Sequence, residues 1–398
     1  MSNILIIANF VGKEEIGGRF VNLASLLNQK WNNIEVITSD FSHGDKKFKD
    51  FESPIYDFNI TRIHEPGYES NISPLRLFSH KVWGKNVYKY IKSLKEKPDL
   101  IYCAIPSLTV AKLIGKYCYK NNIKFVTDIQ DLWPEAFELL FKNKKLKKFI
   151  FKPFHKYANA AYKYSDLVIG VSETYKNRGL KATGKAKGLT VFLGNDINRF
   201  DKAKDNPSLK KNKDEFWIGY IGTLGYSYDI KCVIDAIALL QKSHHIKNIN
   251  FIIMGGGPLK EEFQNYALSK NVLATFTGPL PYEEMVSNLC NCDIVVNPIV
   301  KGGAQSITNK VGDYAFSGKP VVNSQPNQEY RDLLEEYKCR INCEVGNASQ
   351  MAEAIKHLYE EPQLREIMGN NGRRLGEEKF DRNKTYPLIV EAIEKLIM

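Results

Sequence analysis

The stretch Ser306 to Pro320, SITNKVGDYAFSGKP, decides the fold, because it reads as the helix that follows a buried strand. An apolar run, Asp293 to Val300, and a loop of small residues, Lys301 to Gln305, come directly before it. Gly318 and Pro320 end the helix, and a second apolar run follows them. This alternation of strand, loop and helix predicts an α/β domain with a parallel sheet.

The helix in this stretch places chemistry-bearing side chains on one face. Ser306, Lys310 and Asp313 are spaced three or four residues apart, so we expect them to lie together near the helix N-terminus. Free N–H groups and the Lys310 cation suit a phosphate, and Asp313 suits sugar hydroxyls. The alternative is an ordinary surface helix that happens to carry a lysine and an aspartate.

The second half of the chain repeats the alternation around glycine turns. Phe216 to Ile221 is a predicted strand that runs into a turn, and Asn250 to Met254 runs into Gly255 and its neighbours. Bare backbone at the carboxyl ends of such strands suits a nucleotide. The candidate residues in these turns are Gly222, Thr223, Gly225, Gly256 and Gly257.

The first half begins with the same kind of unit. Asn3 to Asn9 and Ile34 to Ser39 read as strands on either side of a helix. Between the first strand and that helix lie Gly17, Gly18 and Arg19, which could hold a phosphate through backbone N–H groups and a guanidinium.

Length and charge divide the chain in two. A chain of 398 residues is long for one core, and two domains are expected. Residues 1–195 carry a net charge of +13 and the remainder a net charge of −2. We predict a first domain over 1–195, a polar linker over 196–215, a second domain over 216–380, and a terminal helix over 381–398 that could pack back on the first domain.

An acidic and aromatic turn follows the strand at Lys124 to Asp128. Its sequence, DLWPE, starts at Asp131, and turns at the carboxyl end of a strand commonly carry chemistry in α/β folds. Asp128, Asp131 and Glu135 are therefore candidate base or hydroxyl-binding groups. The alternative is that Asp131 caps a helix and Trp133 packs beneath it.

Leu139 to Ser165 is rich in lysine and in bulky apolar residues, with eight lysines and no acidic residue. This composition predicts a peripheral anchor on an anionic membrane. A lysine-rich surface helix and a nucleic-acid interface are the alternatives, but no nucleic-acid module accompanies the segment. The residues predicted to meet the membrane are Lys144, Lys145, Lys147, Lys148, Phe149, Phe151 and Lys152.

Several classes of protein are not indicated. The N-terminal run lacks a basic leader, and no stretch is apolar enough to span a bilayer, so we expect a cytoplasmic protein, held peripherally on the inner face of the membrane. Cysteine spacing gives no zinc site, and no Asp-x-Asp motif occurs, so neither a metal nor another cofactor is expected. Nucleic acid is not an expected partner, and the oligomeric state stays open.

Motifs along most of the chain resemble one family, the retaining glycosyltransferases of family 4, which have the GT-B fold of two facing Rossmann-like domains. The motifs are Gly17-Gly18, QDLWPE at Gln130, GVSE at Gly170, LGNDINRF at Leu193, GYIGTLG at Gly219, GGGP at Gly255, GPLPYEE at Gly278 and the stretch at Ser306. The DLWP turn and the NKVGDY sequence look most like the enzymes of bacterial capsule, O-antigen and lipid-linked glycan synthesis.

The resemblance implies a nucleotide-sugar donor in the second domain and an acceptor in the first. Its motifs add Pro258, Pro281, Gln305, Ser306 and Asn309 to the donor-binding candidates. Family members usually carry two Glu residues where this chain has Gln305 and Asp313, so Asp313 is implied to bind the ribose. The family often has Arg and Lys after the first strand of the second domain, where this chain has Thr223 and no matching lysine.

The implied reaction is transfer with retention from a UDP-sugar, an N-acetylated hexosamine or deoxyhexosamine, to a polyprenyl-diphosphate-linked saccharide, without a metal. Lys310 is implied to stabilise the leaving diphosphate, and Asp131 to orient or deprotonate the acceptor hydroxyl. Two rivals remain open: a sugar-nucleotide 2-epimerase on the same fold, and a non-catalytic, membrane-associated partner in a glycan-assembly complex.

Overall fold

A computed structural model describes residues 2–11, 18–31, 33–49, 56–70, 73–138, 144–184, 186–301 and 307–398. The chain forms two compact units, one of residues 1–192 with 386–398 and one of residues 193–385. Each unit is a Rossmann-like α/β domain with a parallel sheet, as the sequence predicts. The described part of the chain contains no helix long and apolar enough to cross a membrane.

The sheet of the first unit has the order β5-β2-β1-β6-β7-β8-β9, with every neighbouring pair parallel. Its strands are β1 Ile4–Ile7, β2 Ile34–Ser39, β5 Asn59–Ile63, β6 Leu100–Ile105, β7 Lys124–Ile129, β8 Leu167–Gly170 and β9 Lys187–Thr190. A small antiparallel pair, β3 Phe41–Ser42 and β4 Lys47–Phe48, stands beside it.

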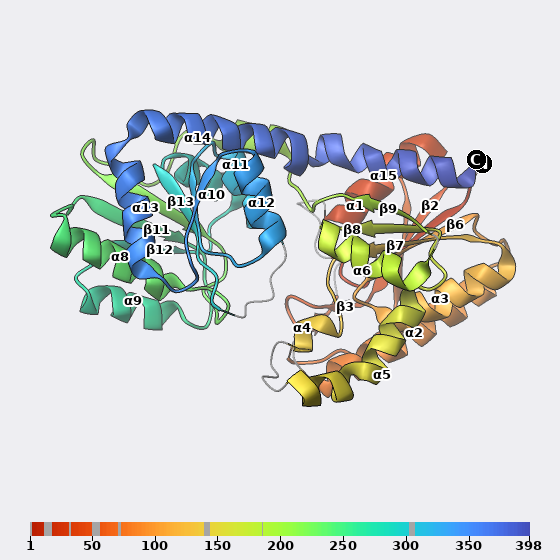
Figure 1. Ribbon diagram of the computed structural model, residues 1–398. Helices are drawn as coiled ribbons and strands as arrows, with labels where there is room; N and C mark the ends of the chain where they lie inside the picture. Colours follow the sequence, from red (N-terminus) through yellow and green to blue (C-terminus); the bar gives the residue numbers. More distant parts are fainter. Residues whose placement is uncertain are drawn as a thin grey trace. The chain divides into compact units, whose positions relative to one another are not determined.

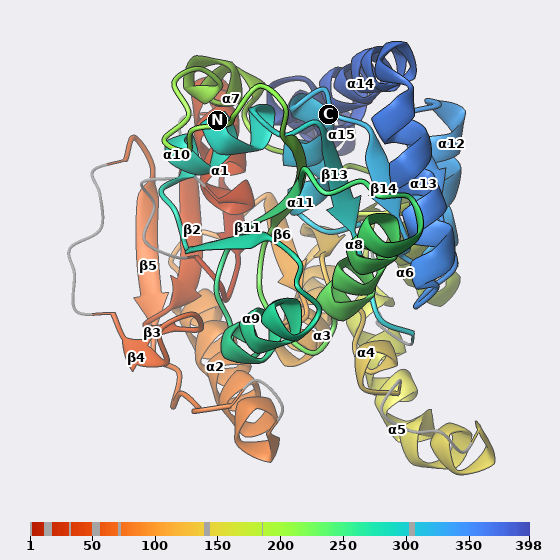
Figure 2. The same ribbon diagram turned by 90° about the vertical axis from the view of Figure 1, so that its left-hand side faces the viewer.

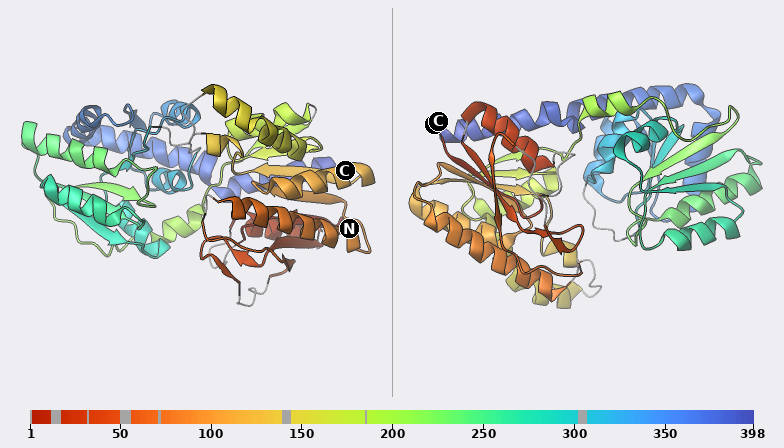
Figure 3. Two further views of the ribbon diagram at one scale, coloured as in Figure 1. Left: turned by 90° about the horizontal axis from the view of Figure 1, so that it is seen from below. Right: turned by 180° about the vertical axis from the view of Figure 1, so that it is seen from behind.

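Helices cover both faces of this first sheet (Figures 1 and 3). The helices α1 and α15 share a core with one face, and α2, α3 and α6 lie on the other, where α5 packs on α3 and α6. The bounds are α1 Arg19–Trp31, α2 Pro74–Ser93, α3 Leu108–Asn121, α4 Glu135–Glu138, α5 Lys144–Tyr162, α6 Glu173–Thr183 and α15 Arg382–Ile397. Tyr386, Ile389 and Ile393 of α15 are buried in the core of the first unit.

The sheet of the second unit has the order β12-β11-β10-β13-β14-β15, again parallel throughout. Its strands are β10 Phe216–Ile221, β11 Ile249–Met254, β12 Ala274–Gly278, β13 Ile294–Asn297, β14 Val321–Asn323 and β15 Arg340–Asn342. Alternate residues of β10 enter different cores: Ile218 packs with α8 and α13, and Trp217 packs with Tyr314 of α11. Burial on both faces explains why this strand is a continuous apolar run.

The helices of the second unit also form two layers around their sheet (Figure 2). Residues of α8, α9 and α13 share one core with the sheet, and residues of α10 and α11 share the other. The bounds are α7 Ile197–Ala203, α8 Ile230–Ser243, α9 Lys260–Ser269, α10 Tyr282–Cys290, α11 Lys310–Phe316, α12 Gln328–Glu336, α13 Ala348–Glu360 and α14 Pro362–Leu375, followed by a π-helix Gly376–Phe380.

The segment predicted as a linker, 196–215, is built differently from that expectation. It contains α7, which is capped by Asp196 and buries Phe200 completely against Phe316, and it belongs to the second unit. Because 201–215 is mostly polar, its composition does not reveal the few buried apolar residues of the segment. Composition therefore predicted a second domain that starts at 216, whereas the second unit starts at 193.

Candidate functional site

The strand order of the second unit fixes where a ligand can bind. Numbered in sequence order, its strands run 3-2-1-4-5-6 across the sheet, so successive strands are added on one side of β10 up to β12 and on its other side from β13 onward. The boundary between β10 and β13 is therefore the topological switch point of the sheet. Ligands of open α/β sheets bind outside the carboxyl ends of the strands at such a point. Gly222 follows β10 there, and the loop after β13 leads to Lys310 at the start of α11.

Lys310 points into this switch point. Its side chain is 8% exposed, and its Nζ lies 4.3 Å from the ring centre of Tyr220 and 4.0 Å from that of Tyr228. A Cβ added to Gly222 would lie 3.6 Å from Nζ, so the amine sits beside the bare backbone that ends β10. Among the described residues no group hydrogen-bonds to Nζ.

The electrostatic state of Lys310 follows from this environment. Burial lowers the pKa of its amine well below the usual value, because the charged form loses its hydration. The two aromatic faces attract a cation, but they do not replace a counter-ion. An anion that reached Nζ would therefore supply the charge partner that the described protein does not provide.

Asp313 lies one turn further along α11 and has different neighbours. Its Oδ1 accepts hydrogen bonds from Asn195 Nδ2 at 2.8 Å and from the Tyr282 hydroxyl at 2.9 Å. Burial raises the pKa of Asp313 to about 6, although both of these hydrogen bonds oppose the rise. No described residue bonds to Oδ2, which leaves one acceptor atom for a hydroxyl donor.

The helix itself differs from the prediction. It begins at Lys310, not at Ser306, and has seven residues, so its dipole is weaker than expected at the site. Asn309 precedes it without a side-chain cap, because its backbone is already helical. Gln305 and Ser306 lie outside the described residues. Lys310 and Asp313 share the helix as predicted, yet they contact separate groups and form no ion pair.

The glycine turns pack on one another more than they open to a ligand. Gly255 and Gly257 have φ of +152° and +154°, and a Cβ would lie 1.9 Å from Gly222 O and 2.4 Å from Leu224 O, respectively. These glycines thus allow two loops to touch. The other predicted donor residues Thr223, Pro258, Pro281 and Asn309 are exposed, and Gly225 and Gly256 are half-buried.

The structure corrects the prediction for Arg19. This residue is 7% exposed and forms an ion pair with Asp128, with 2.7 Å between Nε and Oδ2. It also donates hydrogen bonds to the carbonyl groups of Val191 and Phe192, so it connects α1 to β7 and to the segment that follows β9. Its charge is already balanced, and we withdraw it as a phosphate ligand. Gly17 lies outside the described residues, and a Cβ added to Gly18 would have no described atom within 4 Å beyond its chain neighbours.

Asp131 occupies a different setting from Asp128. Its Oδ2 accepts a hydrogen bond from Trp133 Nε1 at 2.9 Å, and burial raises the pKa of its carboxyl group. The guanidinium of Arg76 lies over the Trp133 ring at 4.5 Å. A carboxylate with a raised pKa at the carboxyl end of β7 fits a proton acceptor.

The predicted membrane residues of α5 divide into two sets. Phe149 is 81% exposed, and Lys148 and Lys152 are also exposed. Phe151 is buried at 6% exposure against Phe154, so the prediction that it faces a membrane is wrong. Lys147 forms an ion pair with Glu138, with 3.5 Å between Nζ and Oε2. Nothing is described of the side chains of Lys144 and Lys145.

Sequence reasoning missed four residues that build the site: Tyr220, Tyr228, Tyr282 and Asn195. Tyr220 lies within an apolar strand and reads as core, and nothing in the sequence brings Tyr228 beside it. Tyr282 and Asn195 lie in the motifs at Gly278 and Leu193, but neither residue was given a role of its own. Among the described residues, no group of three or more His, Cys, Asp or Glu side chains could hold a metal ion.

Residues 201–375 match the model of the family described as glycosyl transferases group 1. An uncharacterized glycosyltransferase of Methanocaldococcus jannaschii is 25% identical over 362 residues, which cover 88% of each chain. The structure of Anabaena HepE in complex with UDP superimposes with a TM-score of 0.70 at 14% identity, covering 99% of this chain and 100% of that one.

A second solved structure of similar fold is that of WaaG, a glycosyltransferase involved in lipopolysaccharide biosynthesis. It superimposes with a TM-score of 0.66 at 13% identity, and 98% of both chains are covered. At this level of identity the structural likeness shows the fold. The family match covers α11 and the glycine turns at Gly222 and Gly255.

Proposed function

We propose that this chain, whose second unit carries a glycosyl transferases group 1 domain, transfers a sugar from a UDP-sugar to a lipid-linked saccharide. The observation that carries the proposal is the buried Lys310 amine, which has no counter-ion among the described residues and lies beside Gly222 at the switch point. A similar fold binds UDP in HepE, and HepE has also been solved in complex with UDP-glucose.

The polar groups of the second unit fix the orientation of the donor, with the diphosphate at Lys310 and the ribose at Asp313. Lys310 binds the diphosphate, since its amine gains a charge partner there. Asp313 accepts a ribose hydroxyl at Oδ2, because Asn195 and Tyr282 occupy Oδ1. The transferred sugar is an N-acetylated hexosamine or deoxyhexosamine. Lys310 supplies positive charge to the diphosphate without a metal.

The reaction retains the anomeric configuration. The bond from the anomeric carbon to the diphosphate oxygen breaks, and a bond to the acceptor hydroxyl oxygen forms on the same face. Protonated Lys310 stabilises the negative charge on the leaving diphosphate. Asp131 orients the acceptor hydroxyl and takes its proton, which suits a carboxylate with a raised pKa.

The acceptor is a polyprenyl-diphosphate-linked saccharide of bacterial surface polysaccharide synthesis, such as capsule or O-antigen. The exposed Lys148, Phe149 and Lys152 support peripheral binding to the inner face of the cell membrane. The similarity in fold to WaaG is consistent with this role.

A donor screen tests the proposal. The full chain is incubated with UDP-sugars and a prenyl-diphosphate-linked saccharide, and products are separated by mass. We expect one UDP-sugar to yield UDP and an acceptor longer by one residue. Conversion of UDP-N-acetylglucosamine without an acceptor would instead identify an epimerase. Failure to bind any nucleoside diphosphate would identify a non-catalytic protein.

The raised pKa of Asp313 predicts a pH dependence of UDP binding. Its carboxyl group has a pKa of about 6 in the folded protein, so it is mostly neutral at pH 5 and ionised at pH 7. The ionised form accepts a ribose hydroxyl more strongly, and affinity should therefore rise with pH through this range. We expect the ratio of wild-type affinity to Asp313→Asn affinity to increase about fivefold from pH 5 to pH 7.

Calorimetric titration with UDP measures this ratio. The phosphate of UDP titrates in the same range, but it does so equally for both proteins, and the ratio removes it. A ratio that stays constant from pH 5 to pH 7 would remove Asp313 from the ribose site.

Exposed residues of α5 predict selective membrane binding. The full chain should float with vesicles that contain anionic phospholipid and stay in solution with neutral ones, because each lysine near such a surface contributes about 1 kcal/mol. Phe149→Asp should reduce the floating fraction severalfold. Phe48→Asp, a change at a half-exposed phenylalanine of β4, is the control and should leave it unchanged. Equal binding to both kinds of vesicle would contradict the anchor.

A further inference from the structure

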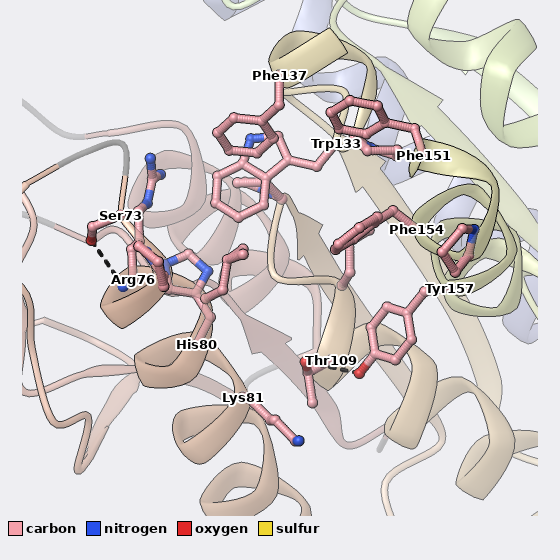
Figure 4. A pocket seen from close by; sticks show the side chains of 16 residues that line it. Ser73, Arg76, His80, Lys81, Thr109, Trp133, Phe137, Phe151, Phe154 and Tyr157 are labelled. Atoms are coloured by element: carbon pink, nitrogen blue, oxygen red, sulfur yellow. Dashed lines mark hydrogen bonds between the residues drawn. The ribbon is translucent and has the colours of Figure 1, made fainter. Parts of the chain in front are cut away.

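A cavity of about 620 Å³ lies in the first unit between α2 and α5, above the start of α3 (Figure 4). Phe151, Phe154 and Tyr157 line it from α5, and Leu77 and His80 line it from α2. Pro106 and Trp133 come from the loops after β6 and β7, so the cavity opens at the carboxyl edge of the sheet. Its volume is within the range of small-molecule sites.

The interior of this cavity is apolar. The hydroxyl group of Tyr157 is already bonded to Thr109 Oγ1 at 3.0 Å. The His80 ring stacks on Trp133 with 5.4 Å between centres and 15° between planes. Burial, together with the charges of Arg76 and His43, lowers the pKa of His80 to about 3, so the ring is neutral at physiological pH. A sugar ring placed here would lose hydration without gaining enough hydrogen bonds.

Positive charge stands at the rim of the cavity. The Arg76 guanidinium lies over Trp133 at 4.5 Å, and Lys81 also lines the cavity. Figure 4 shows Arg76 on the α2 side, opposite the aromatic side chains of α5. Leu75 and Phe78 of α2, which do not line the cavity, are more than half exposed. An apolar interior beside cations complements a hydrocarbon chain that carries an anionic head group.

We propose that this cavity holds the first isoprene units of a prenyl diphosphate, with the diphosphate near Arg76. This inference rests on the proposed lipid-linked acceptor, and it identifies which part of the acceptor the first unit recognises. The aromatic and proline walls suit a branched chain, which would bury apolar surface that the described protein leaves exposed.

Farnesyl diphosphate is the probe, because it carries both parts of the ligand and dissolves in water. We expect it to bind the full chain saturably and to change tryptophan fluorescence through Trp133. Inorganic diphosphate, which lacks the chain, and farnesol, which lacks the charge, should each bind at least about tenfold more weakly. The Trp133→Phe variant should lose most of the signal in fluorescence while calorimetry still detects binding.

Two leucines of α2 give a matched pair of variants. Leu77 lines the cavity and is 46% exposed; Leu75 does not line it and is 63% exposed. Because both are exposed in the first turns of the helix, neither Leu77→Asp nor Leu75→Asp should unfold the protein. Leu77→Asp should weaken binding of farnesyl diphosphate about tenfold or more, and Leu75→Asp should leave it unchanged. Phe154→Asp, a second cavity variant, should behave like Leu77→Asp.

Equal effects of Leu77→Asp and Leu75→Asp would overturn the cavity as the binding site. Farnesol binding as tightly as farnesyl diphosphate would indicate a general apolar pocket and would overturn the diphosphate contact. Binding of farnesyl diphosphate with no sugar transfer would leave the cavity assigned and refute the transferase. Sugar transfer that is equally fast with and without the prenyl chain, in wild type and Leu77→Asp alike, would do the reverse.

Discussion

Replacing Lys310 with methionine is expected to weaken UDP binding about 10- to 100-fold and to leave the protein folded. The charged hydrogen bonds between an amine and a diphosphate contribute about 1.5–3 kcal/mol, and methionine cannot make them. Methionine has a similar length and suits the space between Tyr220 and Tyr228. Binding is measured by calorimetric titration with UDP, and turnover should fall by at least as much.

The same substitution should not reduce stability. The pKa of Lys310 is lowered in the folded protein, so at neutral pH the unfolded chain binds a proton more readily than the folded one, and the buried amine destabilises the fold. Lys310→Met removes this cost, and its thermal midpoint should equal or exceed that of the wild type. The difference should shrink as the pH rises toward about 10.4, where the unfolded lysine also loses its charge.

Proton uptake provides a third measurement. UDP raises the pKa of Lys310 from its lowered value, so binding takes up a proton at pH values between the two, and affinity falls as the pH rises through that range. Calorimetry over a series of pH values, in buffers of different ionisation enthalpy, detects this uptake, which Lys310→Met should abolish. Lys231→Met is the control, since Lys231 is half-exposed and paired with Glu262 at 2.6 Å. A larger loss from Lys231→Met would move the phosphate site to α8.

The sheets could be predicted from the sequence because their central strands are buried on both faces. Phe216 to Ile221 is the clearest case: its residues alternate between two cores, all six are apolar or glycine, and the observed strand has the predicted bounds. The structure of the region after Asn195 was harder to predict. Its lysines and its scarcity of large apolar residues suggest a linker, whereas single buried residues such as Phe200 tie it to the second unit.

The sequence predicted two residues of the candidate site and none of their contacts. Spacing singled out Lys310 and Asp313 as candidates, but it implied that they act side by side on one face. In the structure Lys310 faces two tyrosines and Asp313 faces Asn195 and Tyr282, groups distant in sequence. Arg19 shows the converse: its position after a glycine pair suggested a phosphate, while the buried Asp128 that neutralises it lies 109 residues away. Pairings of this kind depend on the tertiary fold.

Gly255→Ala is expected to destabilise the second unit by about 3 kcal/mol or more. Its φ of +152° is strained for any residue with a Cβ, and that Cβ would lie 1.9 Å from the Gly222 carbonyl oxygen. The contact is between two backbones, so no side chain can move to relieve it. Because Gly222 adjoins Lys310, the displaced loop should also weaken UDP binding in any protein that remains folded.

Thermal unfolding followed by circular dichroism measures the first effect, and titration with UDP below the midpoint measures the second. Gly225→Ala is the matched control for stability in the neighbouring turn, where, among the described residues, the added Cβ would approach Thr223 Cγ2 at 3.6 Å. It should leave the thermal midpoint almost unchanged. If Gly255→Ala were as stable as Gly225→Ala, the two loops could not touch as described, and the position of Gly222 beside Lys310 would have to be revised.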